Sequence, residues 1–503
     1  MRPTDEQAAI IASEAQRLRV LALAGTGKTS TLKMFAEANP GARILYLAFN
    51  RWVADEVRRA FPRHVTAKTT HSVALRSFGQ RYRGQIGELR IWELAERLHS
   101  PYTNPPVRTR FARYARETLH NWFASPDPHI SAQHLPGVLK RDPGERMALD
   151  RPIDRERVLQ VAWRLWDEMR DPTNESVPIP HDGYLKQWSL NQPTLPYDIV
   201  LLDEAQDTNA PVLEVLKHQP GRLVFVGDPM QAIYAWRGAV NAMAMPSDET
   251  LYLTGSFRFG PEIAEVGDAV LQWVSPRAPQ LRGLAQPGYV GKLLKGHQLA
   301  VLGRTNEGLF DMAASLVTQR PDARVGWIGG ISAYGFDVIE QVYRLWSPKL
   351  EPDDPDIARF QDFDALKDYA DHAGDVRLKI RAKVVDKYGD RTPEILATLR
   401  AADYGDRAPN VFSTVHRAKG GEWPQVVMAA DFAEMMDDGA PVDLKAKARN
   451  SKNPEAVMED GRLRYVAATR AQRCLRPDGD CMAYLRWLRQ RSRGQATANA
   501  ATG

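Results

Sequence analysis

Short apolar runs rich in β-branched residues recur along this chain, and helical periodicity follows most of them. Such alternation predicts strand–helix–strand units whose strands pair in parallel. The first set of strand candidates is Arg19–Ala22, Ile44–Ala48, Ile199–Asp203 and Leu223–Gly227. The second set is Leu299–Leu302, Val325–Ile328, Val411–Val415 and Val426–Ala430. Because each set is about large enough for one open sheet, the sequence predicts an α/β protein with two parallel-sheet domains.

Two segments of different character interrupt these sheet domains. Residues 77–196 are rich in arginine and aromatic residues and contain several proline clusters, which predicts a helical insertion in the first domain. A shorter insertion, residues 332–404, interrupts the second domain. The remaining boundaries are therefore 1–76 and 197–250 for the first sheet domain, 251–331 and 405–492 for the second, and 493–503 for a flexible tail. We expect that tail to be frayed because its residues are small and polar.

Composition excludes several classes of protein. The 503 residues include 67 lysines and arginines against 62 aspartates and glutamates, a net charge of +5. Hydrophobic residues make up 43%, a globular balance that excludes disordered and collagen-like chains. The charge excess permits a nucleic-acid partner but is too small to argue for one.

Targeting signals are also missing from the sequence pattern. No apolar run approaches the roughly 18 residues of a membrane-spanning helix, and the acids near residue 5 do not fit a signal peptide. The two cysteines, Cys474 and Cys481, are too few for a disulfide framework or a complete zinc site. We therefore expect a soluble protein of the cytoplasm or nucleoid, with no membrane partner.

A glycine-rich segment between a predicted strand and a predicted helix is the strongest local signal. Its glycines allow backbone N–H groups to surround phosphate oxygens, Lys28 can bind the β- and γ-phosphates, and the Thr29 hydroxyl can ligate Mg²⁺. Ala22 replaces the first glycine of the strict pattern, and a chance glycine-rich turn is the alternative interpretation. The predicted nucleotide-binding residues are Ala22, Leu23, Ala24, Gly25, Thr26, Gly27, Lys28 and Thr29.

Two adjacent carboxylates end the predicted strand at Asp203. Asp203 is placed to hold Mg²⁺, directly or through water, and Glu204 could polarise the attacking water. Alone, this pattern is often a simple strand-to-loop exit. Together with the phosphate loop it predicts a nucleoside triphosphatase that uses Mg²⁺.

A third segment, residues 226–238, places Gln231 close to Tyr234, Trp236 and Arg237. In a coupling loop, Gln231 would contact the γ-phosphate and the two rings would stack on bases, each stack contributing about 1–3 kcal/mol. The alternative is that Tyr234 and Trp236 are ordinary core residues.

With these motifs in this order, the chain resembles superfamily 1 helicases of the UvrD, Rep and PcrA type, and is most similar to the helicase part of the F-box DNA helicases. Further motifs carry the resemblance: Thr4–Gln7, Phe49–Asn50, Thr70–Ser72, Gly255–Phe259, Gly303–Asn306, Ser413–Trp423 and Tyr465–Ala471. The resemblance implies two RecA-like motor domains of the P-loop NTPase fold.

The sequence also departs from the family pattern. Leu23 replaces a glycine, Gly421 replaces a leucine, and the segment Arg473–Asp480 lacks a clean apolar strand. No F-box motif precedes Gln7, so we do not expect ubiquitin-ligase recruitment.

The resemblance implies roles for individual residues. Gln7 would read adenine, Phe257 would stack on it, and Glu422 would hold the ribose hydroxyls. Arg258 and Arg470 would reach the γ-phosphate, so the implied catalytic residues are Lys28, Glu204, Gln231, Arg258 and Arg470. The implied DNA-binding residues are Phe49, Asn50, His71, Tyr234, Trp236, Arg237, Arg304, Thr414 and His416. Salt bridges for the arginines, core packing for Phe257 and structural roles for both histidines are the alternatives.

These features predict an ATP-dependent 3′–5′ helicase or translocase on single-stranded DNA, which would unwind 3′-tailed duplex DNA or displace bound protein. Replication, recombination or repair would be its setting, recombination or repair proteins its candidate partners, and ATP its only small-molecule substrate. The direction follows from the resemblance alone. Two alternatives stay open: a DNA-dependent ATPase switch that never separates strands, and a motor subunit of a larger assembly.

Overall fold

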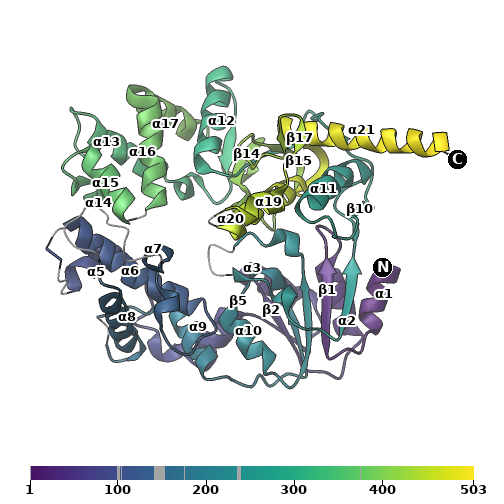
Figure 1. The fold of residues 1–503 in the computed structure, drawn as a ribbon, viewed down its shortest axis with the longest axis horizontal. Coiled ribbons are helices and arrows are strands. Elements are labelled where there is room, and N and C mark those ends of the chain that lie inside the picture. The colour runs from purple at the N-terminus through teal and green to yellow at the C-terminus, as the bar shows by residue number, and fades with distance from the viewer. Residues whose placement is uncertain are drawn as a thin grey trace.

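The computed structural model describes residues 2–98, 102–103, 105–140, 153–174, 176–234, 239–373, 375–451 and 453–502 (Figure 1). These residues contain two six-stranded sheets, and every strand pair within them is parallel. The predicted α/β fold with two parallel sheets is therefore confirmed.

The first sheet has the strand order β3-β2-β4-β6-β1-β8. Its strands are β1 (Arg17–Ala22), β2 (Ile44–Ala48), β3 (Val65–Thr69), β4 (Ile199–Leu202), β6 (Arg222–Gly227) and β8 (Glu249–Leu253). Its helices are α1 (Asp5–Ala12), α2 (Lys28–Glu37), α3 (Arg51–Ala60), α4 (Thr70–Ser77) and α10 (Ala210–Lys217). Because the strands are parallel, their carboxyl ends share one edge of the sheet, and the loops that follow β1, β4 and β6 meet there.

The second sheet has the order β11-β18-β15-β12-β14-β13. Its strands are β11 (Tyr289–Val290), β12 (Leu299–Gly303), β13 (Val325–Trp327), β14 (Asn410–Thr414), β15 (Trp423–Met428) and β18 (Ala471–Arg476). Its helices are α11 (Pro261–Val274), α12 (Asn306–Gln319), α18 (Val415–Ala418), α19 (Leu444–Arg449), α20 (Pro454–Ala468) and α21 (Gly479–Thr502). Three short pairs complete the strands: β5 (Thr208–Asn209) with β7 (Ala239–Val240), β9 (Gly255–Ser256) with β10 (Arg282–Gly283), and β16 (Met436–Asp437) with β17 (Ala440–Pro441).

Helices form both of the segments that were predicted as insertions (Figure 1). The first contains α5 (Ile91–Arg97), α6 (Pro105–Phe123), α7 (Gly137–Lys140), α8 (Arg155–Arg170) and α9 (His181–Leu190). The second contains α13 (Phe336–Trp346), α14 (Pro355–Ala358), α15 (Phe363–Ala373), α16 (Val376–Tyr388) and α17 (Thr392–Ala401). Helices α6 and α15 contact each other, so the two segments touch. The domain boundaries stay predictions.

Strand β4 shows how the first sheet is held between two apolar layers. All four of its residues are buried. Val200 and Leu202 pack with side chains of the first helical segment, including Trp122, whereas Ile199 and Leu201 pack with α2 and α3. A central strand covered on both faces explains why this sequence is a continuous apolar run.

Strand β18 corrects one expectation from the sequence. The segment after Arg470 was expected to lack an apolar strand, yet β18 pairs with both β15 and β11. Cys474 and Leu475 are fully buried, whereas Arg473 and Arg476 are exposed. The two buried residues supply the apolar part of this strand. The exposed arginines on either side of them mask the apolar pattern in the sequence. Strands β3, β8 and β11 were also missed, and each lies at the edge of a sheet.

The end of the described chain differs from expectation as well. Helix α21 continues through the expected frayed segment to Thr502 and projects away from the sheets (Figure 1). Alanines at 496, 498, 500 and 501 favour this continuation, because alanine has the highest helix propensity. In the second sheet, Val415 begins α18 where a strand end was predicted. Within the described chain, no helix has both the length and the apolar character of a membrane span.

Candidate nucleotide and nucleic-acid site

The predicted phosphate loop connects the end of β1 to the start of α2. Gly25 and Gly27 adopt φ values of +74° and +79°, a left-handed conformation that glycine tolerates without strain. A Cβ atom on Gly25 would lie 2.4 Å from the Ser256 hydroxyl and 2.7 Å from Cβ of Arg258. The backbone N–H of Phe257 also donates to the Gly25 carbonyl at 2.9 Å. Gly25 therefore lets the segment after β8 approach the loop closely.

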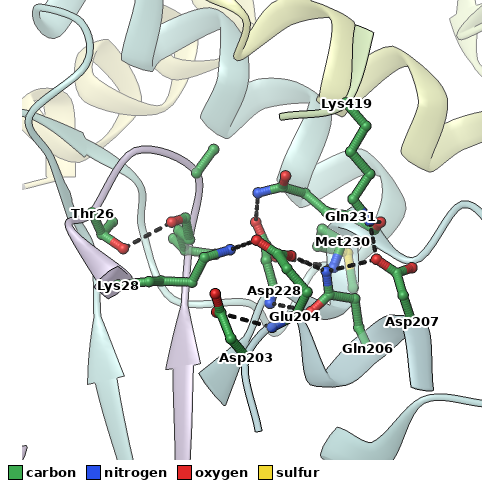
Figure 2. A network of polar contacts seen from close by, with 12 residues as sticks. Thr26, Lys28, Asp203, Glu204, Gln206, Asp207, Asp228, Met230, Gln231 and Lys419 are labelled. Carbon is green, nitrogen blue, oxygen red and sulfur yellow. Dashed lines mark hydrogen bonds and ion pairs between the residues drawn. The ribbon is translucent and has the colours of Figure 1, made fainter. Parts of the chain in front are cut away.

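Lys28 lies among buried carboxylates at the carboxyl edge of the first sheet (Figure 2). Its ammonium group contacts Glu204 at 2.9 Å. Burial alone would lower the pKa of Lys28, but the charges of Glu204, Asp203 and Asp228 outweigh burial and raise it. The loop lysine is thus firmly protonated, as binding of an anionic phosphate requires.

Asp203 and Glu204 have opposite shifts in pKa. Burial and the neighbouring charge of Glu204 raise the pKa of Asp203 to about 6. Although burial opposes it, the attraction of Lys28 and Lys419 lowers the pKa of Glu204 to about 2. Glu204 is therefore ionised at neutral pH and able to accept a proton.

The donor set fits Mg²⁺. The Tyr46 hydroxyl donates to Asp203 at 2.6 Å, and the Thr29 hydroxyl lies within hydrogen-bond reach of the same Tyr46 hydroxyl. Mg²⁺ usually binds through one or two protein oxygens together with substrate phosphates and water. Within the described residues, no cluster of three or more His, Cys, Asp or Glu side chains could hold a metal ion by itself.

Gln7 and Phe257 both lie close to the second loop glycine, Gly27. A Cβ atom on Gly27 would lie 3.4 Å from the Gln7 amide and 3.5 Å from the Phe257 ring. The Gln7 amide donates to Thr31 at 3.1 Å and its carbonyl oxygen accepts from the Thr4 backbone at 3.0 Å, so the side chain is fixed. Phe257 is 48% exposed, which leaves a ring face accessible. The structure brings both residues to the loop, and their adenine-binding roles stay predictions.

Arg258 and Arg470 come from different elements. Arg258 lies against Gly25 of the phosphate loop and Arg470 contacts Gln231, and the region that these residues surround is called the cleft below. Arg470 is buried and donates to the Gln231 side-chain carbonyl at 3.1 Å. Burial, together with repulsion from Arg258, lowers the pKa of Arg470 to about 9, which keeps it charged at neutral pH. Arg258 pairs with Glu422 at 2.6 Å and donates to the Thr469 carbonyl at 2.8 Å. Arg258 and Glu422 therefore neutralise each other beside Arg470.

Gln231 lies at the junction between the two sheets (Figure 2). Its amide donates to Asp228 at 2.8 Å, and its carbonyl oxygen accepts from Arg470. Lys419, which follows α18, donates to the Gln231 backbone carbonyl at 2.5 Å. One glutamine thus contacts a carboxylate of the first sheet and two cations of the second.

Four residues of this network were not singled out from the sequence: Lys419, Asp207, Tyr465 and Asp228. Lys419 forms a buried ion pair with Asp207, and burial raises the pKa of that carboxyl to about 6. Tyr465 accepts a hydrogen bond from the Ala24 N–H at 3.2 Å and donates to Asp228 at 3.1 Å, so it joins the phosphate loop to the loop after β6. All four residues lie inside motifs already recognised or directly after strands. A polar residue there, in an otherwise apolar context, is the signal that could have identified them.

A second group of predicted residues meets beside this cleft. The rings of Phe49 and Tyr234 stack with centroids 5.6 Å apart and an interplanar angle of 14°. The Tyr234 hydroxyl donates to the His416 carbonyl at 2.9 Å. Phe49 is 43% exposed. The structure therefore brings three predicted DNA-binding residues together from three elements and leaves an aromatic face accessible.

The other predicted DNA-binding residues have different surroundings. The Asn50 side chain caps α3 by accepting the Val53 N–H at 2.9 Å. His71 contacts Asp182, in the first turn of α9, at 3.2 Å. Arg304 pairs with Asp460 at 2.7 Å, and Thr414 is buried at the end of β14. Trp236 and Arg237 lie outside the described residues. The DNA roles of all these residues stay predictions.

Comparison with known proteins gives two family matches. Residues 5–237 match the AAA domain family, and residues 401–476 match the UvrD-like helicase C-terminal domain family. The first match includes the phosphate loop, both carboxylates and Gln231, and the second includes Lys419, Glu422 and Arg470. The matches therefore cover both sides of the cleft.

Individual relatives are similar over nearly the whole chain. F-box DNA helicase 1 of Gallus gallus is 34% identical over 501 residues, which cover 94% of this chain and 48% of that protein. F-box DNA helicase protein 1 of Schizosaccharomyces pombe is 26% identical over 521 residues, 94% of this chain and 57% of that protein. The RecBCD enzyme subunit RecB of Chlamydia pneumoniae is 29% identical over 106 residues, 19% of this chain and 10% of that protein. The chain spans about half the length of the two F-box relatives.

Proposed function

The chain belongs to the UvrD-like family of superfamily 1 helicases, and from this premise we propose that it is an ATP-driven motor on single-stranded DNA. It moves 3′ to 5′ and separates duplex strands or displaces bound protein. The observation that carries this proposal is the position of Gln231, which contacts Asp228, Arg470 and Lys419 at the boundary of the two sheets. A change at the nucleotide can therefore alter the contact between the sheets.

The residues of the cleft divide the work of ATP hydrolysis. When ATP binds, Lys28 exchanges its contact with Glu204 for the β- and γ-phosphates, which frees Glu204 to orient and deprotonate water. The water oxygen bonds to the γ-phosphorus as the bond to the β–γ bridging oxygen breaks, giving ADP and phosphate. Arg470 and Arg258 stabilise the charge on the phosphoryl group. Thr29 and Asp203 would hold Mg²⁺, which supplies positive charge to the phosphates.

The motor also needs a surface that holds the strand. The accessible face of the Phe49 and Tyr234 stack suits this role, because aromatic rings bind every base without sequence preference. Tyr234 follows Gln231 by three residues, so the same loop contacts the cleft and the stack. This continuity supports the coupling of hydrolysis to DNA grip.

The first test measures ATP hydrolysis with and without oligo(dT). We expect strong stimulation by DNA, and a Glu204→Gln variant that binds ATP normally but hydrolyses it about 10²–10⁴ times more slowly, because an amide cannot accept the proton. Glu214→Gln, on the solvent side of α10, is the matched control. Hydrolysis at the parental rate in Glu204→Gln would disprove the assigned base.

The second test measures single-turnover unwinding of duplexes with a 3′ or a 5′ single-stranded tail. Unwinding of the 3′-tailed duplex alone supports the proposed direction. Unwinding of only the 5′-tailed duplex would reverse the direction. DNA-stimulated hydrolysis without any unwinding or displacement of streptavidin from biotinylated DNA would favour the switch over the motor.

A further inference from the structure

A hollow of about 320 Å³ lies where the second helical segment meets both sheets. Tyr234 reaches it from the first sheet, Thr414 and His416 from the second sheet, and α13 and α16 from the helical segment. Its volume is at the lower end of the range of about 300–1,000 Å³ that is typical of ligand sites. None of the roles assigned above uses the helical segment at this place.

One wall of the hollow is cationic. Arg377 and Arg381 lie four residues apart on α16, and Arg417 lies on α18. Neither arginine of α16 has a carboxylate within ion-pair distance among the described residues, although Asp375 attracts Arg381 from further away. Burial lowers the pKa of Arg381, the charge of Asp375 opposes this effect, and the charge of Arg377 adds to it. An anion bound beside both arginines would favour their charged forms.

The guanidinium of Arg381 is held in a defined place. It packs against Gly335, where a Cβ atom would lie 2.6 Å from its nearest nitrogen. Gly335 has a φ of +76°, so glycine is favoured there for both conformation and space. Arg417 donates to the Ala333 carbonyl at 3.1 Å and lies over the Tyr334 ring, 5.4 Å from its centroid. Contacts with the protein therefore position Arg381 and Arg417, whereas Arg377 is exposed.

Much of the remaining lining is apolar or aromatic. Its side chains are Tyr234, Phe310, Phe336, Ile339, Ile380 and Val384. Among the described residues, Glu307 is the single carboxylate that lines the hollow. A hollow lined by both cations and aromatic or apolar groups suits a nucleotide, which carries a phosphate at one end and a flat base at the other.

We propose that this hollow binds one nucleotide of the single DNA strand, with its backbone phosphate held by Arg377 and Arg381 of α16. The inference rests on the proposed function and extends it to the second helical segment. Continuity supports DNA as the ligand, because Tyr234 forms part of the hollow and also stacks on Phe49. A strand bound on that stack therefore lies next to the arginines.

The test uses the full chain and a fluorescent oligo(dT), with affinity measured over a series of salt concentrations. Each phosphate contact on a single strand contributes about −0.7 to the slope of log K against log salt. We expect Arg381→Ala and Arg377→Ala each to reduce the slope by about 0.7. Each should also weaken binding about tenfold at low salt, the low end for a hydrogen bond to a charged group. Lys383→Ala, an exposed cation on α16 that does not line the hollow, should leave slope and affinity unchanged.

The outcomes separate this inference from the proposed function. If the parent chain does not bind oligo(dT), the proposed function fails. If the parent binds and both arginine variants keep its slope and affinity, only the inference about the hollow is wrong. A free phosphate-bearing ligand is tested with a fluorescent ATP analogue, and loss of nucleotide affinity without loss of DNA affinity would also overturn the inference. Because Arg377 is exposed, Arg377→Ala decides the matter should Arg381→Ala fail to fold.

Discussion

Each of the two sheets has six parallel strands, yet the loops of the two sheets carry mostly opposite charges into the cleft. The first sheet supplies carboxylates, with Asp203 after β4 and Asp228 after β6. The second supplies cations, with Lys419 after α18 and Arg470 directly before β18. Lys28 and Glu422 are exceptions: Lys28 binds carboxylates of its own sheet, and Glu422, from the second sheet domain, pairs with Arg258. Neither sheet alone holds a complete set of groups for phosphoryl transfer, so we expect the reaction to require both sheets.

The largest effect is expected from removing Lys28, the cation that the first sheet itself supplies to the cleft. Lys28→Ala should abolish ATP hydrolysis, because the loop loses its cation for the β- and γ-phosphates. ATP binding should weaken at the same time. Lys33→Ala, half-exposed on the same helix, is the control and should retain both activities. Nucleotide titration and a steady-state ATPase assay measure the two effects, and substantial hydrolysis by Lys28→Ala would contradict the account.

Removing a cation of the second sheet should affect turnover more than binding. Arg470→Ala should lower the rate of hydrolysis by about 10³–10⁵, as for other arginines that stabilise a departing phosphoryl group. Affinity for ATP should change much less, because the charge matters most in the transition state. Exposed Arg473 on β18 provides the control variant Arg473→Ala. Equal losses of rate and affinity would indicate simple ground-state binding.

The buried pair between the sheets should contribute to stability. Lys419→Met leaves Asp207 buried without its cation, which typically costs about 3–5 kcal/mol of unfolding free energy. Lys419→Met combined with Asp207→Asn removes both charges and should recover part of that loss. Urea unfolding of the three proteins measures the difference. If the double variant were no more stable than Lys419→Met, the buried carboxylate would not be the cause.

The smallest effect is expected on the DNA side, where the Phe49 ring is partly exposed. Phe49→Ala should weaken binding of oligo(dT) by about 1–3 kcal/mol, the usual contribution of one base stack. The slope of log K against log salt should not change, because a stacking ring displaces no counterions. A titration at several salt concentrations tests both statements. A changed slope would show that Phe49 acts by positioning cations.

Central strands with continuous apolar sequences were predictable from the sequence, whereas edge strands and contacts between distant residues were not. The central strands β2, β4 and β6 were found because residues covered on both faces form apolar runs. Strands β3 and β8 were missed because edge strands are only half-covered. The phosphate loop was recognisable because its chemistry is local. The Lys419–Asp207 pair joins residues 212 positions apart, and no local pattern encodes such a contact.

The coupling of the two sheets through Gln231 is the central claim, and the DNA-stimulated ATPase rate of Gln231→Ala tests it most directly. The hydrogen bonds of its side chain to Asp228 and Arg470 contribute about 1.5–3 kcal/mol each, but they join two parts of the protein and do not anchor either ligand. The variant should therefore bind ATP and oligo(dT) nearly as the parent does, yet lose most of the stimulation by DNA. Full stimulation in a variant that binds both ligands would contradict the account and leave Gln231 as a structural residue of the loop.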